Sequence, residues 1–169
     1  MDLSNQVIKV ARQYADSAYK EKPGNLNIFG DWYGRNGIPW CAIFVSYCFN
    51  QAGAGVILNG VQTSKGFHSC SAAVNVYHKR NQIRPTIDAK PGDIVFMNFT
   101  GSGSHDHVGI VIRNNTEKKQ LYTVEGNTIN PNGTGDQVNG DGVYYKTRPY
   151  KYITAIVRPS WKLLDKDKK

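Results

Sequence analysis

The segment GIPWCAIFVSYCF, residues 37–49, places a cysteine at the predicted start of an apolar helix. The Gly-Ile-Pro run ends whatever structure precedes it, and almost no polar side chain follows Trp40. A helix that is apolar on nearly every side is predicted to lie buried in the centre of a domain. We therefore expect a central helix from about Trp40 to Gln51, with Cys41 in its first turn.

This position favours a catalytic role for Cys41. Free N–H groups and the helix dipole stabilise negative charge at a helix N-terminus, so they lower the pKa of a thiol there. The same N–H groups can hold the oxyanion of a tetrahedral intermediate. Cys41 is therefore predicted to be a nucleophile, with an inert buried thiol as the alternative. Cys48 and Cys70 are interpreted as packing residues.

Outward from this helix, the apolar pattern changes from helical spacing to strand-like alternation. Further helices are predicted over residues 3–20 and 69–80, with an ordered glycine-rich loop over residues 23–38. Strands are predicted over residues 94–99, 107–112, 121–125, 143–146 and 153–157. Helices followed by an antiparallel sheet are typical of an α+β fold. We expect one catalytic domain over residues 1–160 and a basic tail, or the start of a linker, over residues 161–169.

Composition limits the partners and the compartment. The 169 residues carry a net charge of +8, which favours nucleic acid, an anionic membrane surface or anionic cell-wall polymers. The basic residues are scattered and no zinc-finger spacing occurs, so nucleic acid is the weakest of these partners. No apolar stretch is long enough to span a membrane. The unpaired cysteines and the absence of a recognisable signal peptide predict synthesis in the cytoplasm, and we expect a monomer.

A cysteine nucleophile needs a general base, and the base needs an orienting group. Among the four histidines, His107 begins a predicted strand. His68 and His78 lie in polar surroundings typical of the surface, and His105 lies in a loop rich in glycine and serine, where it is expected at most to line the cleft.

Strand register gives His107 candidate partners. If residues 107–112 and 121–125 form a hairpin centred on residue 116, His107 lies opposite Glu125. Asn127 lies just beyond on the same face, because side chains two apart share a face. These two side chains are predicted to orient the imidazole and to stabilise its positive charge. An ordinary histidine at a strand end is the alternative.

Four segments occur in an informative order: WCAIFVS at residues 40–46, PGDIV at 91–95, HVGIV at 107–111 and VEGN at 124–127. Together they resemble the CHAP domains, the cysteine, histidine-dependent amidohydrolases/peptidases of the NlpC/P60-like, papain-related group. The resemblance covers about residues 3–160. It implies a papain-like α+β fold in which N-terminal helices pack on a C-terminal antiparallel sheet.

The resemblance implies that the substrate is bacterial peptidoglycan, cleaved at an amide bond. That bond joins muramic acid to L-alanine, or lies in the stem peptide or the cross-bridge. Carried over by position, the catalytic residues are Cys41 as nucleophile, His107 as general base and then acid, and Glu125 and Asn127 as the orienting pair.

The substrate groove is predicted to be lined by aromatic side chains and one histidine, namely Trp32, Tyr33, Trp40 and His105. Core packing is the alternative for each aromatic residue. Some relatives bind calcium in the loop before the cysteine. Here that loop contains Asp31 and Asn36, but Ile43 stands two residues after Cys41, where those relatives carry an acidic residue. The stretch 136–142 also lacks the spacing of a calcium loop, so we expect no metal and no other cofactor.

The leading hypothesis is the catalytic domain of a phage endolysin, made without a signal peptide and acting at the cell wall after release. A component of a phage-tail or conjugation machine and an antibacterial effector are alternatives that use the same fold. A non-catalytic wall-binding module and an acyltransferase that passes the thioester to an amine are also open.

Overall fold

The computed structural model describes residues 2–133 and 136–164. Its helices are α1 (Leu3–Asp16), α2 (Ile28–Tyr33), α3 (Cys41–Gln51) and α4 (Cys70–Lys79). Its strands are β1 (Ile83–Arg84), β2 (Ile94–Met97), β3 (His107–Asn115), β4 (Gln120–Thr128), β5 (Gly142–Pro149) and β6 (Ile153–Val157). Helices precede an antiparallel sheet, so the predicted α+β class is confirmed.

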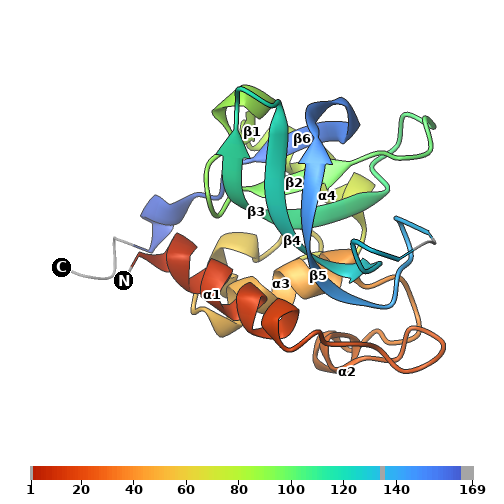
Figure 1. Cartoon of the computed structure of the whole chain (residues 1–169). Helices are drawn as coiled ribbons and strands as arrows, with labels where there is room; N and C mark the ends of the chain where they lie inside the picture. The colour runs from red at the N-terminus through yellow and green to blue at the C-terminus, as the bar shows by residue number, and fades with distance from the viewer. Residues whose placement is uncertain (1, 134–135, 165–169) are drawn as a thin grey trace.

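The six strands form one sheet in the order β1-β6-β2-β3-β4-β5, and every neighbouring pair is antiparallel. Helices α1 and α3 lie along one side of this sheet (Figure 1). The main apolar core joins these helices to the sheet. A smaller apolar cluster contains Ala89, Val95, Met97, Val111, Leu121 and Ile156.

Helix α3 begins at Cys41 and ends at Gln51, close to the predicted limits. Eight of its 11 residues are buried, in agreement with its apolar sequence. Its N-cap residue, Trp40, makes no side-chain capping hydrogen bond. The first N–H groups of this helix are therefore available to other acceptors, as expected at a helix N-terminus.

Two predicted boundaries differ from the structure. Helix α1 ends at Asp16 rather than near residue 20, because Ala18 has a left-handed backbone conformation with φ of 49°. The predicted loop over residues 23–38 contains the short helix α2, whose start is capped by the Asn27 side chain accepting from the Gly30 N–H at 2.8 Å.

The predicted register of the β3–β4 hairpin is wrong by two residues. The ladder pairs Ile110 with Val124 and Val111 with Thr123, and a β-bulge follows before Arg113 pairs with Tyr122. The bulge has a consequence for the site. Without the extra residue, the side chains of β3 before it would point to the opposite face of the sheet. The bulge therefore puts His107 on the same face as Glu125.

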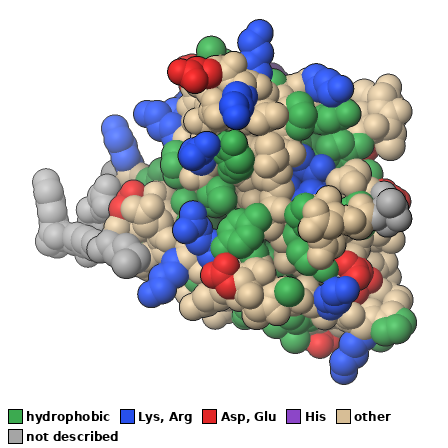
Figure 2. Space-filling view, in the orientation of Figure 1, with side chains coloured by type: hydrophobic (Ala, Val, Ile, Leu, Met, Phe, Trp, Pro, Cys, Tyr) green, Lys and Arg blue, Asp and Glu red, His purple; other side chains and the backbone are tan. Residues whose placement is uncertain are grey.

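Residues 165–169, which form most of the predicted basic tail, lie outside the described residues. Just before them, the Trp161 ring stacks on Phe49 with ring centroids 5.5 Å apart. On the face shown in Figure 2, Lys and Arg side chains are spread over the surface rather than gathered in one patch. In the described part of the chain, no helix has both the length and the apolar character needed to cross a membrane.

Candidate active site

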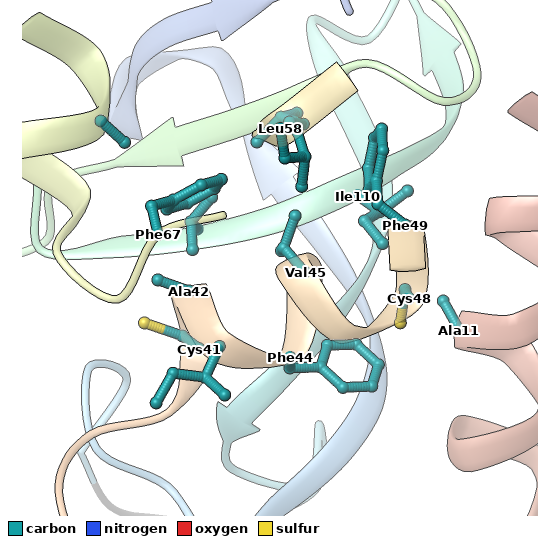
Figure 3. Packing of buried hydrophobic residues seen from close by; sticks show 14 of the residues in the cluster. Ala11, Cys41, Ala42, Phe44, Val45, Cys48, Phe49, Leu58, Phe67 and Ile110 are labelled. Carbon is teal, nitrogen blue, oxygen red and sulfur yellow. The ribbon is translucent and has the colours of Figure 1, made fainter. Parts of the chain in front are cut away.

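Cys41 lies at the first turn of α3 with only 5% of its surface exposed. Figure 3 shows its sulfur at the N-terminal end of the helix, whereas Cys48 lies further along, on the side of α3 next to Ala11 of α1. All three cysteines are free thiols. The fold therefore places Cys41 where backbone N–H groups at a helix start can act on it.

His107, the first residue of β3, is fully buried beside the nucleophile candidate. Its Nε2 donates a hydrogen bond to Glu125 Oε2 at 2.8 Å. Its Nδ1 has no hydrogen-bond partner among the described residues, yet His107 and Cys41 each shift the pKa of the other. Glu125 thus fixes one ring nitrogen and leaves the other free to exchange a proton with Cys41.

Glu125 is held by more than the histidine. Its Oε1 accepts from Thr123 Oγ1 at 2.6 Å and from Arg148 Nε at 2.9 Å. Its Oε2 accepts from Arg148 Nη2 at 2.5 Å as well as from His107. Four hydrogen bonds and a paired guanidinium make a fully buried carboxylate tolerable at this position. A Cβ at Gly109 would lie 2.6 Å from Glu125 Cγ, so the glycine leaves the space that this carboxylate occupies.

Arg148, on β5, belongs to the site although no sequence pattern predicted it. It is 5% exposed, and its guanidinium lies over the Phe99 ring at 4.6 Å from the centroid. Its Nη1 donates to Gln137 Oε1 at 2.8 Å. No motif points to it, because it lies 23 residues after Glu125 on a neighbouring strand. The only available signal was that Arg148 lies two residues after Lys146, the last residue of the predicted strand 143–146.

The pKa shifts describe an ion pair. Hydrogen bonding from the Cys70 thiol makes the largest contribution to holding the pKa of Cys41 well below its usual value, against the effect of burial. The neighbouring His107 and its charge lower it further. Burial lowers the pKa of His107, but the charge of Glu125 and the interaction with Cys41 raise it to about 9. Cys41 thiolate and His107 imidazolium are therefore the expected forms at neutral pH.

The carboxylate stays ionised in this cluster. Burial raises the pKa of Glu125, but the hydrogen bonds and charge of Arg148, followed by those of His107, outweigh burial and leave that pKa far below its usual value. An ionised Glu125 can stabilise the imidazolium and fix its orientation.

Asn127 is fully buried, but its amide serves another contact. Its Nδ2 donates to the Val138 carbonyl at 3.1 Å, and its Oδ1 has no partner among the described residues. Its backbone is left-handed, with φ of 54°. Of the predicted orienting pair, Glu125 contacts His107, whereas Asn127 ties β4 to the segment around Val138.

The residues predicted to line a groove have different environments. Trp40 has no exposed surface, stacks on Phe29 and donates to Glu21, so the structure places it in the core. Tyr33 is 7% exposed and its hydroxyl is bonded to Thr63.

Trp32 and His105 are half-buried. Lys65 lies over the Trp32 ring at 5.4 Å, and His105 Nδ1 is 2.8 Å from Thr154 Oγ1. These two side chains remain the accessible members of the predicted set.

The loop before Cys41 does not present a ready calcium site. Asp31 Oδ1 accepts from Asn36 Nδ2 at 2.6 Å, and Asn36 Oδ1 accepts from the N–H groups of Asn27 and Gly37. Across residues 2–133 and 136–164, no cluster of three or more His, Cys, Asp or Glu side chains is arranged to hold a metal ion.

Comparison with known proteins identifies the family. One solved structure, described as the crystal structure of Ly7917 with the hydrolyzing product of MDP, matches with a TM-score of 0.47 and 18% identity, over 92% of this chain and 62% of that one. This chain thus spans less than two thirds of that structure. No curated protein matches. The model of the CHAP domain matches residues 32–127, more than half of the chain and the part that contains Cys41, His107 and Glu125. The chain belongs to the CHAP-domain family.

Proposed function

We propose that this chain is a peptidoglycan hydrolase that cleaves an amide bond through a Cys41 thioester. Membership of the CHAP family supports peptidoglycan hydrolysis as the activity. The observation that carries the mechanism is the buried chain of contacts from Arg148 through Glu125 to His107, which leaves Nδ1 of the imidazole free beside Cys41. A structural cysteine needs none of these contacts.

In the acylation step, the Cys41 thiolate attacks the carbonyl carbon of the scissile amide. The uncapped N–H groups at the start of α3 stabilise the oxyanion that forms. The His107 imidazolium then gives its Nδ1 proton to the leaving amine as the C–N bond breaks. Glu125 stays ionised and holds the ring through Nε2.

In the deacylation step, neutral His107 takes a proton from a water molecule that attacks the thioester. The C–S bond breaks, and the thiolate and imidazolium are restored with a free carboxylate as the product. An amine in place of water would give acyl transfer, so the two reactions differ only in which nucleophile reaches the thioester.

We propose that the bond is either the N-acetylmuramoyl-L-alanine amide or a peptide bond of the stem or cross-bridge. The chemistry at Cys41 is the same for each. The proposed setting is the catalytic domain of a phage endolysin, acting as a monomer at the cell wall after release. The net charge of +8 supports adhesion to anionic wall polymers.

The test is clearing of purified Gram-positive cell walls, followed by turbidity and by release of new amino groups. Wild type is compared with Cys41→Ala and with Cys48→Ala as the matched control for loss of a buried thiol. We expect wild type and Cys48→Ala to clear the walls and Cys41→Ala to fail. Mass spectrometry of the released fragments identifies which amide bond is cleaved.

Two outcomes would overturn the proposal. Equal clearing by wild type and Cys41→Ala would exclude the thioester mechanism. Binding to walls of several chemotypes without release of amines by any variant would instead favour a non-catalytic wall-binding module.

A further inference from the structure

The fold brings a second thiol to the proposed nucleophile. Cys41 is the first residue of α3, and Cys70 is the first residue of α4. Both belong to the same core cluster, with 5% and 8% of their surfaces exposed. The Cys70 thiol lies within hydrogen-bonding reach of Cys41, so the sulfur atoms at these two helix starts are neighbours.

This juxtaposition is built by specific contacts. The Ser46 hydroxyl, on α3, accepts from the Phe67 N–H at 3.0 Å and donates to the Phe67 carbonyl at 2.9 Å. Phe67 itself is fully buried, and Figure 3 shows it lying over Ala42. Three residues later the chain enters α4, so these bonds hold the segment just before α4 against helix α3.

The approach also needs a glycine. A Cβ at Gly66 would lie 2.6 Å from Ser46 Oγ, and the backbone there has φ of 113°, which side chains rarely adopt. The close contact between the segment before α4 and helix α3 is therefore specified by Gly66 and Ser46. Packing of Phe67 alone does not require it.

We propose that Cys70 is a positioning residue that donates its S–H to the Cys41 thiolate and holds that sulfur for attack. The inference rests on the proposed role of Cys41 as the nucleophile. Cys70 keeps its proton throughout the reaction. It stabilises the thiolate before attack, and again when the C–S bond of the thioester breaks and the electron pair returns to the Cys41 sulfur.

The opposite effects on the two thiols support this direction of donation. The interaction is the largest cause both of the lowered pKa of Cys41 and of the raised pKa of Cys70. Asp106 also raises the pKa of Cys70 through its negative charge, which keeps this thiol protonated. A thiol that stays protonated beside one that ionises is a donor, because a hydrogen bond to a charged acceptor is stronger than one to a neutral acceptor.

The experiment measures the rate at which iodoacetamide alkylates Cys41 across a pH series, by mass spectrometry of the peptide that contains it. Wild type is compared with Cys70→Ala, which removes the donor, and with Cys70→Ser, which keeps one. Cys48→Ala is the control for loss of a buried thiol elsewhere on α3. The assay needs no substrate, so its result is separate from whether the chain cleaves peptidoglycan.

We expect Cys70→Ala to slow alkylation about tenfold near pH 6, the effect of losing a hydrogen bond to a charged group. Rates should converge at high pH, where Cys41 ionises in every variant. Cys70→Ser and Cys48→Ala should stay close to wild type.

The proposal is overturned if Cys70→Ala alkylates like wild type at low pH. It is also overturned if Cys41 alkylation slows equally in Cys70→Ala and Cys70→Ser. A slowing in Cys70→Ala that is the same at every pH would overturn it as well. The last pattern is what a purely structural role predicts.

Discussion

Cys41 and Cys48 lie two turns apart on the same helix, and both are buried, yet their environments are opposite. Burial alone raises the pKa of Cys48 well above its usual value. The pKa of Cys41 is lowered by Cys70, His107 and the Ala42 N–H, although burial acts against this. One helix thus carries an inert thiol and a candidate nucleophile.

The groups that contact a thiol in this helix, and not its burial, therefore decide whether it can ionise. Cys48 faces the apolar contact between α3 and α1 (Figure 3). Cys41 faces the polar side chains of His107, Glu125 and Arg148, which lie on β3, β4 and β5. It also faces Cys70 at the start of α4. The apolar side of α3 forms part of the core, and the N-terminus of α3 lies beside the proposed catalytic side chains.

Exchange of each thiol for alanine separates the two roles most strongly. Cys41→Ala should lower wall hydrolysis by at least about 10⁴-fold, as expected for loss of a nucleophile, with little change in stability. Cys48→Ala should keep activity but lower the free energy of unfolding by about 1–2 kcal/mol through a small cavity. Turbidity measures wall hydrolysis, and urea denaturation measures the free energy of unfolding. The distinction between the two thiols would be contradicted if both variants lost hydrolysis, or if both lost only stability.

Removing the base should make Cys41 resemble Cys48. His107→Ala is expected to reduce hydrolysis by about 10²–10⁴-fold, the range for general acid–base catalysis. It should also raise the pKa of Cys41, because the imidazolium charge is lost. The pH dependence of Cys41 alkylation measures this rise. An unchanged alkylation profile would show that His107 does not act on the thiol.

The ion pair behind the histidine is expected to matter for stability as well as activity. Arg148→Met leaves Glu125 charged and buried without its guanidinium, at a cost of about 3–5 kcal/mol in the free energy of unfolding. Arg113→Met is the control, since Arg113 is exposed over Tyr122 and should cost at most about 1 kcal/mol. Equal losses in urea denaturation would contradict the assigned role of Arg148.

A smaller change tests the geometry of Glu125 alone. Gly109→Ala places a methyl group against Glu125 Cγ, where the contact would be 2.6 Å. Overpacking of this kind costs about 1–3 kcal/mol. The carboxylate should move away from His107, so kcat/KM should fall while Cys41 remains present. Wild-type kcat/KM in a folded Gly109→Ala protein would show that this carboxylate position is not needed.

The mildest test is the pH profile of hydrolysis by the wild type. His107 has a pKa raised to about 9, so it is protonated below this value and loses its proton above it. Because the leaving amine needs that proton, kcat/KM should fall above about pH 9, approaching tenfold per pH unit. A fall centred near the ordinary histidine pKa of about 6.5 would contradict the assigned pairing with Glu125 and Cys41.

The sequence predicted the central helix, the position of Cys41 and the contact between His107 and Glu125. Each depends on local patterns: an apolar run after a Gly/Pro break, and side-chain alternation in a hairpin. The register itself was wrong because Asn115 pairs with Gln120, so the turn lies later in the chain than a hairpin centred on residue 116. The bulge between Val111 and Arg113 has no marker in the sequence, and it reduces the error in register by one residue. The contact survived because a shift of two residues keeps side chains on the same face.

Arg148 and the role of Cys70 were beyond sequence reasoning. Arg148 reaches Glu125 only because β5 pairs with β4. Cys70 follows a segment whose backbone is bonded to Ser46 of α3 at Phe67, and this brings it toward Cys41. Both contacts join segments that are distant in the chain, and no local pattern of residues specifies them.

The most direct test of the account compares Cys41 and Cys48 in one molecule. Native wild-type protein is treated with a limiting amount of iodoacetamide near neutral pH, and the labelled cysteines are mapped by mass spectrometry. We predict that Cys41 is labelled first, with a rate that stays high well below the ordinary thiol pKa of about 8.5, while Cys48 remains unlabelled. A Cys41 that is labelled only as ordinary thiols ionise would contradict the claim that its partners make it the nucleophile.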